Sequence, residues 1–199
     1  MLGPEHPHTL STAGNLANSI HQQGRYAEAE TLSHKTLAAL QRVLGPEHPH
    51  TLRTAANLAN ALDEQGKVAD ATSMYREILV AQQRVLGPEH PETLATTASL
   101  AGMLFDEGKY AEALPKYREV IVIQQRVLGP EHPDTLQTVA SLAAALNNQG
   151  NHAEAEALLR QTLEIQQRAL GPEPPITLFT SDTLAKCVRS AREMSDTAK

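Results

Sequence analysis

The hexapeptide Leu-Gly-Pro-Glu-His-Pro occupies residues 44–49 and is repeated along the chain. Identical copies begin at Leu2, Leu44, Leu86 and Leu128, so consecutive copies start 42 residues apart. A degenerate copy, Leu-Gly-Pro-Glu-Pro-Pro, begins at Leu170. A period of roughly 20–50 residues is typical of proteins built from stacked structural repeats. The sequence therefore predicts four full repeats and the first part of a fifth.

The segment after each hexapeptide has the period of an amphipathic α-helix. In the first repeat, apolar residues three and four positions apart fall on one helical face: Leu10, Ala13, Leu16, Ala17 and Ile20. Pro7 suits the first turn of a helix, and Gly24 can end the helix in a left-handed conformation. We expect a first helix over about residues 7–23.

A second helix follows in the same repeat, over about residues 26–43. Its predicted buried stripe contains Tyr26, Ala29, Leu32, Thr36, Leu37 and Leu40. Arg42 lies in the last turn, where a cation complements the helix dipole. Gly45 and Pro46 then stop the helix. Since the same start and stop residues recur in every repeat, each repeat is predicted to be a pair of antiparallel helices.

Composition narrows the class of protein. The formal net charge is -6 and the sequence pI is about 5.8, which argues against binding to nucleic acid or to anionic lipid. The N-terminus has neither a basic region nor an apolar stretch, so no secretory signal is predicted. No apolar run approaches the ~20 residues of a membrane helix. We expect a soluble, cytoplasmic protein.

Helix pairs of this kind become stable by stacking on one another. The predicted fold class is therefore all-α, a solenoid of antiparallel helix pairs that forms a single domain over residues 1–199. Its repeats span 2–43, 44–85, 86–127 and 128–169, followed by a capping helix at about 175–192. Phe179, Leu184, Ala185 and Val188 are expected to continue the core into that helix, and a polar end that reaches Lys199 is expected to cap it.

The stretch from Asn57 to Ala71 resembles the core pattern of tetratricopeptide repeats. It has a Leu-small pair, a Gly between the helices and a small residue early in the second helix. The usual aromatic after the Gly is present as Tyr26 and Tyr110, whereas Val68 and His152 depart from it. HEAT and armadillo repeats have similar lengths, but the Tyr-Ala-Glu-Ala that follows Gly favours the tetratricopeptide type. The repeat length and the linker are similar to those of the kinesin light chain subclass.

This resemblance implies a right-handed superhelix whose first helices line a concave groove that holds a peptide or a partner helix. Carried over position by position, the pattern predicts these groove residues: Asn15, Asn18, His21, Arg53, Asn57, Asn60, Asp63, Glu64, Ser99, Phe105, Asp106, Gln137, Ser141, Asn147 and Asn148.

The predicted groove residues suggest a kind of ligand. The asparagines can donate and accept hydrogen bonds, which suits an extended backbone, although exposed Asn can also simply keep a helix face soluble. Phe105 is either an anchor for the ligand or packs against the next repeat. Asp63, Glu64 and Asp106 make the centre of the groove acidic. A basic or neutral protein ligand is therefore expected, unlike the acidic ligands that suit kinesin light chains.

No catalytic, cofactor or metal site is predicted. Four of the nine histidines belong to the repeated linker, where stacking keeps them roughly 10 Å apart. That distance is too long for a shared metal ion. The single cysteine, Cys187, has no repeated His or Asn near it and is expected to be structural. No phosphate-binding Gly-Lys-Ser or Gly-Lys-Thr sequence occurs.

We therefore expect a protein-interaction scaffold rather than an enzyme. The alternatives are a kinesin light chain-like cargo adaptor, and a sensor or structural array belonging to a larger signalling protein. No long heptad segment that could join a motor heavy chain is present. The first repeat lacks a polar cap, so the chain is either part of a longer array or can associate with another copy through this repeat.

Overall fold

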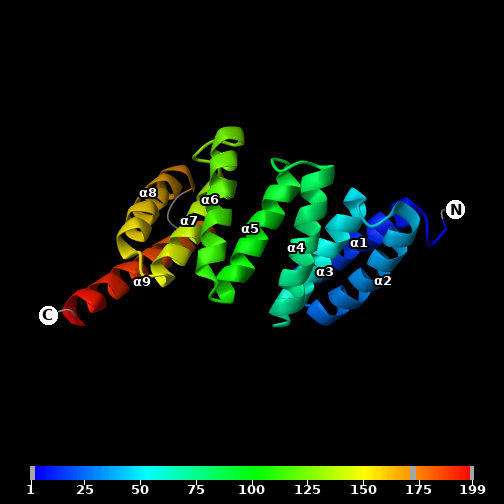
Figure 1. The fold of residues 1–199 in the computed structure, drawn as a ribbon, viewed down its shortest axis with the longest axis horizontal. Helices are drawn as coiled ribbons and strands as arrows, with labels where there is room; N and C mark the ends of the chain where they lie inside the picture. The colour runs from blue at the N-terminus through cyan, green and yellow to red at the C-terminus, as the bar shows by residue number, and fades with distance from the viewer. Residues whose placement is uncertain (1–2, 171–173, 198–199) are drawn as a thin grey trace. The chain divides into compact units, whose positions relative to one another are not determined.

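The computed structural model describes residues 3–170 and 174–197. Leu2, most of the degenerate linker and Lys199, all named above, lie outside the described residues. The described part contains helices and no strand (Figure 1): α1 Pro7–Gln22, α2 Tyr26–Leu44, α3 Pro49–Asp63, α4 Val68–Val85, α5 Pro91–Asp106, α6 Tyr110–Val127, α7 Pro133–Asn148, α8 His152–Leu170 and α9 Pro175–Thr197. The predicted helix pairs are confirmed, with ends within two residues of the expected ones except at the last helix.

The linker histidines begin the first helices. His6, His48, His90 and His132 each precede the Pro that opens a first helix. In each case the ring Nδ1 accepts a hydrogen bond of 3.2 Å from the backbone N–H two residues further on. This bond satisfies one of the N–H groups that a helix start leaves without a partner. The repeated His is therefore an N-cap.

Two further contacts explain other invariant linker residues. The Thr51 hydroxyl donates to the Gly45 carbonyl at 2.8 Å, and the bond recurs in the first and fourth repeats at 3.0 and 2.9 Å. Gly45 has a φ of 91°, a conformation that side chains disfavour. Arg84 forms an ion pair with Glu47 of the same linker, and Arg42 and Arg168 pair in the same way with Glu5 and Glu131.

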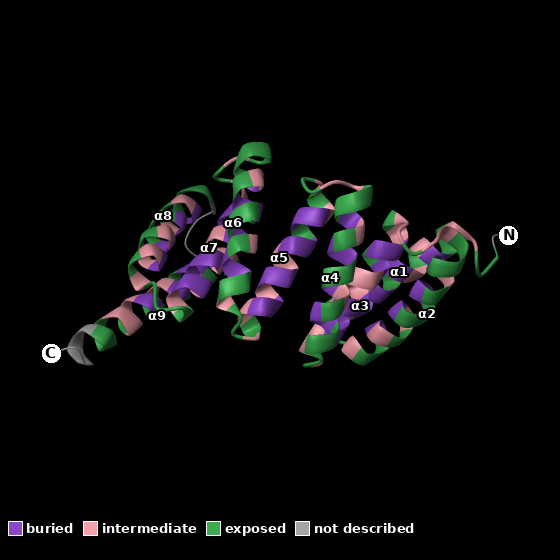
Figure 2. Cartoon of the chain, in the orientation of Figure 1, coloured by how far each residue is buried: buried purple, intermediate pink, exposed green. Residues whose placement is uncertain are grey.

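The chain divides into two compact units, residues 1–103 and 104–199. In the first unit, α1 packs on α2 and α3 on α4, so each repeat is a helical hairpin. Helix α3 also packs on α2 and on α1, which stacks the second hairpin on the first. Ile20, Ala29 and Ala61 form a buried cluster where these helices meet, with Leu32 against it. Figure 2 shows buried and exposed residues alternating along α2 and α4.

The second unit follows the same plan. Helix α7 packs on α6 and on α8, and α9 packs on α8 and α7. The small residue early in each second helix is fully or almost fully buried in all four repeats, at Ala29, Ala71, Ala113 and Ala155. A small side chain there lets neighbouring helices approach closely, as the sequence predicts.

Three expected core positions are wrong. Leu16 is 54% exposed, whereas Leu58 at the same position of the next repeat is 2% exposed, because α2 packs on α3 there. Phe179 is 44% exposed and Ala185 is exposed, so α9 presents part of its predicted core face to solvent. Helical period predicts which residues share a face, but neighbouring helices decide whether that face is covered.

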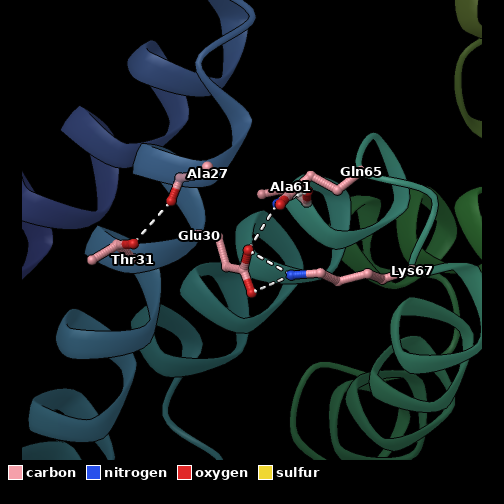
Figure 3. Close-up of polar contacts among 6 residues, drawn as sticks. All are labelled: Ala27, Glu30, Thr31, Ala61, Gln65 and Lys67. Atoms are coloured by element: carbon pink, nitrogen blue, oxygen red, sulfur yellow. Dashed lines mark hydrogen bonds and ion pairs between the residues drawn. The ribbon is translucent and has the colours of Figure 1, made fainter.

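A polar contact also joins the first two hairpins (Figure 3). The carboxylate of Glu30 in α2 accepts hydrogen bonds from the Lys67 ammonium at 2.8 and 2.9 Å and from the Gln65 amide at 2.9 Å. The bond from Lys67 is the main reason that the pKa of Glu30 is lowered below its usual value, and the bond from Gln65 adds to it. Lys67 immediately precedes α4, so this contact links hairpin one to the start of the second helix of hairpin two.

Candidate functional site

The predicted groove residues lie on the first helix of each hairpin or at its end. In the first unit they belong to α1, α3 and the part of α5 up to Ser99, and in the second unit they belong to the end of α5 and to α7. Six of them are exposed: Asn15, Arg53, Glu64, Asp106, Gln137 and Asn148. The other nine are half-buried: Asn18, His21, Asn57, Asn60, Asp63, Ser99, Phe105, Ser141 and Asn147. All of them therefore keep some contact with solvent, and none is part of the fully buried core.

Hydrogen bonding separates the asparagines of the first unit. The Asn57 amide donates to the Gly14 carbonyl of the preceding hairpin at 3.4 Å. The Asn60 side-chain oxygen accepts from the Tyr75 hydroxyl at 2.5 Å. The side chains of Asn15 and Asn18 form no hydrogen bond within the part of the chain that the structure describes. Thus the amides of α1 remain available to a ligand, whereas those of α3 are used by the scaffold.

Two buried tyrosines, which the repeat pattern did not mark as site residues, lie near this group. Tyr75 in α4 is 2% exposed and Tyr117 in α6 is 5% exposed, and burial raises the pKa of each to about 12. The Tyr75 hydroxyl donates to Asn60, and Ser99 opposes part of the rise in the pKa of Tyr75 as Ser141 does for Tyr117. Ser99 and Ser141 therefore lie near buried tyrosine hydroxyls.

The other polar groove residues of the second unit are also partly engaged. The Asn147 side-chain oxygen lies 2.8 Å from Nδ1 of His152, which begins α8. The Asn148 amide donates to the Ala144 carbonyl of its own helix at 3.1 Å. Gln137 is exposed and forms no such bond among the described residues. Few side-chain amides in this unit are as free as those of α1.

Aromatic rings pair where the first helix turns into the second. Phe105 and Tyr110 have ring centroids 5.6 Å apart at an interplanar angle of 55°, and His21 and Tyr26 have centroids 5.2 Å apart at 57°. Of the two roles predicted for Phe105, packing does occur, but against the tyrosine that begins α6. Next to Phe105, the Asp106 carboxyl has a pKa raised by burial.

A third group of polar residues lies near the start of α3. The Arg53 guanidinium and the Ser11 hydroxyl approach Nδ1 of His50, at 3.0 and 3.5 Å. Burial, together with the charge of Arg53, lowers the pKa of His50. His50 was not predicted as a groove residue, although its position two residues after the linker His would have placed it beside Arg53.

The remaining candidate chemistry has structural explanations. Cys187 is buried, its thiol donates to the His152 carbonyl at 3.4 Å, and burial raises its pKa. Within residues 3–170 and 174–197, no group of three or more His, Cys, Asp or Glu side chains is arranged to hold a metal ion. Over the same residues, no helix combines the length and the apolar character needed to cross a bilayer.

Family models for the tetratricopeptide repeat match residues 8–82, 93–134 and 135–176. The chain belongs to the tetratricopeptide repeat family. Tetratricopeptide repeats are generally non-catalytic modules that bind other proteins. None of the curated proteins compared with the chain matches it.

Solved structures of tetratricopeptide proteins agree with this assignment. The nearly identical TPR-like repeats of a kinesin light chain candidate from Podosopora anserina are 30% identical to the chain, with a TM-score of 0.80. The match covers 98% of this chain and 92% of that chain. A variant of the same protein gives a TM-score of 0.81 at 30% identity, over 98% and 91% of the two chains. The expected kinesin light chain-like type of repeat is confirmed.

A more distant structure shows the same fold. BtubC (BKLC) from P. vanneervenii is 19% identical, with a TM-score of 0.79 over 95% of this chain and 77% of that chain. At this level of identity the similarity is evidence for the fold alone. The tetratricopeptide scaffold is thus established, and its ligand must be inferred from the first-helix residues of this chain.

Proposed function

We propose that this chain is a protein-interaction scaffold, and that the face formed by its first helices binds an extended peptide or a helix of a partner protein. One observation carries the proposal. The side-chain amides of Asn15 and Asn18, on the solvent side of α1, have no hydrogen-bond partner among the described residues. Each amide can donate and accept, as a peptide backbone also does, so the pair can hold an extended ligand.

The proposed ligand is basic or neutral. Glu64 and Asp106 are exposed carboxylates on or just after first helices, and neither has an ion-pair partner among the described residues. The chain as a whole carries a formal net charge of -6. Both features favour approach of a basic partner. A pair of peptides of equal length, one with Lys and one with Glu at alternate positions, tests this charge preference. Tighter binding of the Glu peptide would contradict it.

A pull-down with the whole chain tests the binding face. The Asn15→Ala/Asn18→Ala variant removes the free amides, and the Gln41→Ala/Gln83→Ala variant removes two exposed amides of second helices as a control. Partners that bind the wild type and the control, but not the Asn variant, would support the proposal. Retention of every partner by the Asn variant would contradict it.

The proposal includes the domain organisation predicted from the sequence. Residues 1–199 form one non-catalytic, cytoplasmic array with repeats 2–43, 44–85, 86–127 and 128–169.

The exposed Leu16 and its neighbours His8, Thr12 and Ala13 line a shallow apolar depression on α1. We propose that a second copy of the chain can pack there. Sedimentation of the wild type and of a Leu16→Gln variant tests this, and identical masses at high concentration would contradict it.

A second candidate function is that of a kinesin light chain-like cargo adaptor. The 30% identity to the repeats of the Podosopora anserina kinesin light chain candidate favours it. This function predicts that partners captured through the first-helix face include cargo proteins that move with a kinesin motor. Capture of partners without any associated motor, in a cell that expresses kinesin heavy chain, would favour the general scaffold.

A further inference from the structure

The turn between α5 and α6 joins two aromatic residues and a carboxylate that are close in the sequence. Phe105 and Asp106 end α5, and Tyr110 begins α6. The rings of Phe105 and Tyr110 pack against each other with centroids 5.6 Å apart, and both side chains are only half-buried. Together, Phe105, Asp106 and Tyr110 are called the α5–α6 corner below.

The Asp106 carboxylate has no cationic partner among the described residues. No ion pair or hydrogen bond to its side chain occurs in the part of the chain that the structure describes. The Asp106 carboxyl is nevertheless partly shielded from solvent, and this burial raises its pKa. Its negative charge also reaches the Tyr117 hydroxyl, whose pKa it raises in addition to the larger effect of burial. A carboxylate that is partly desolvated and unpaired gains from a cation supplied from outside.

Among the described repeats, only this corner combines a ring pair with a carboxylate. Hairpin one has the ring pair of His21 and Tyr26, but Gln22 stands where Asp106 stands. Hairpin two has acidic residues, Asp63 and Glu64, but Val68 replaces the tyrosine. The fourth hairpin has Asn147, Asn148 and His152 at these positions. The repeat scaffold therefore requires neither the aromatic pair nor the carboxylate at this place.

We propose that the α5–α6 corner binds the cationic side chain of an Arg or Lys residue of the protein ligand. The cation lies against the half-buried rings of Phe105 and Tyr110, and Asp106 accepts hydrogen bonds from its N–H groups. Aromatic rings attract cations through their negative faces, and a carboxylate forms strong bonds with guanidinium and ammonium groups. The inference rests on the proposed function, because it gives that ligand a basic side chain at a defined place.

NMR of the phenylalanine rings tests this site on the whole chain. The chain has two phenylalanines, Phe105 and Phe179, so ring-labelled Phe gives two sets of signals, and a Phe179→Leu variant assigns them. The probe is N-acetyl-arginine N-methylamide, and its citrulline analogue is the neutral control of nearly the same shape. We expect the arginine probe to shift the Phe105 signals in a saturable way, while Phe179 serves as an internal reference.

Two charge-removing variants complete the test. Asp106→Asn is expected to weaken the response of Phe105 to the arginine probe about tenfold, because it removes a charge-assisted hydrogen bond. Glu164→Gln changes the net charge equally at an exposed position of α8 and is expected to leave the response unchanged. An equal response to citrulline, an unchanged response in Asp106→Asn, or no response of Phe105 would each overturn the inference.

The outcome is separable from that of the proposed function. The Asn15→Ala/Asn18→Ala variant leaves the α5–α6 corner intact, so its Phe105 signals should still respond to arginine. If that variant loses its protein partners while Phe105 of the wild type ignores arginine, the scaffold function stands and the cation site is wrong. If Phe105 responds to arginine but no partner depends on Asn15 and Asn18, the cation site stands and the proposed binding face is wrong.

Discussion

Asn15 and Asn57 occupy the same position in consecutive repeats, as do Asn18 and Asn60, yet the two pairs have different surroundings. In α3 both amides bond to the protein itself, one to the Gly14 carbonyl and one to the Tyr75 hydroxyl. In α1 neither amide has a partner among the described residues. The position in the repeat fixes where a side chain lies, but residues of other helices decide whether its amide is bonded within the protein.

One substitution between the repeats accounts for half of this difference. Tyr75 extends from α4 to Asn60, whereas α2 has Ser33 at the same position, and Ser33 is 1% exposed. A serine side chain is too short to reach from a second helix to the equivalent amide of the first helix. Hairpin one therefore has the free amide, and hairpin two has the more extensive internal contacts.

The largest effect is expected when hairpin two is made like hairpin one. Tyr75→Ser removes a side chain that is 2% exposed and should lower the free energy of unfolding by roughly 3–5 kcal/mol, because it leaves a cavity. Urea denaturation followed by circular dichroism measures the change. A loss below about 1 kcal/mol would show that Tyr75 does not hold this face together.

A smaller effect is expected from the asparagines themselves. Asn57→Ala/Asn60→Ala removes two internal hydrogen bonds and should cost roughly 2 kcal/mol of stability. Asn15→Ala/Asn18→Ala should change stability by less than about 0.5 kcal/mol, because these amides bond only to solvent. The same denaturation experiment compares the two, and equal losses would remove the distinction between the pairs.

Alkaline pH should also reveal the effect of Tyr75, which hairpin two has and hairpin one lacks. Burial raises the pKa of Tyr75 from 10.0 to about 12, so the folded state keeps a proton that the unfolded state loses above pH 10. The stabilisation that comes from keeping Tyr75 protonated is therefore fully present below pH 10 and is lost as the pH rises towards 12. The Tyr75→Phe variant should lose less stability over this range than the wild type, by up to roughly 2–3 kcal/mol at the alkaline end. Parallel curves for the two proteins would contradict this expectation.

The N-caps should show no difference between the hairpins. His6 and His48 accept the same hydrogen bond at 3.2 Å, so His6→Ala and His48→Ala should each cost about 1 kcal/mol. Asn at either position can accept the same bond and should restore most of the loss. Thermal unfolding of the four variants measures this. Failure of both Asn variants to restore stability would mean that the ring acts through packing instead.

The smallest effects are expected at the linker ion pairs. Arg42 with Glu5 and Arg84 with Glu47 join exposed side chains in equivalent positions. Replacing either arginine by Gln should change stability by less than about 0.5 kcal/mol, and equally in the two hairpins. A loss above about 1 kcal/mol in high salt would indicate that the arginine stem packs on the helix rather than pairing in solvent.

Much of the fold could be predicted from local sequence. Each helix begins at a Pro or just after the hairpin Gly, and Gly24 adopts the left-handed φ of 75° expected for it. These features depend on a few adjacent residues, so the repeat shows them directly. Exposure of Leu16 could not be predicted in this way, since it depends on which helix covers α1.

Less of the candidate site than of the fold could be predicted from the sequence. Pattern alone placed Asn15 and Asn57 in one class, but their hydrogen bonds differ because of residues in other helices. The sequence does contain one indication of this difference, because residue 14 is Gly where later repeats have Ala. A Cβ at Gly14 would lie 2.9 Å from the Thr54 hydroxyl oxygen, so α1 and α3 approach closely there, and the Asn57 amide reaches the Gly14 carbonyl.

NMR of the asparagine side-chain amides tests most directly whether the first hairpin offers free amides to a ligand. The ligand is a peptide selected on the wild-type chain from a random display library. On addition of this peptide, we predict that the amide signals of Asn15 and Asn18 shift, while those of Asn57 and Asn60 keep their positions. Shifts confined to Asn57 and Asn60, with Asn15 and Asn18 unchanged, would contradict the account.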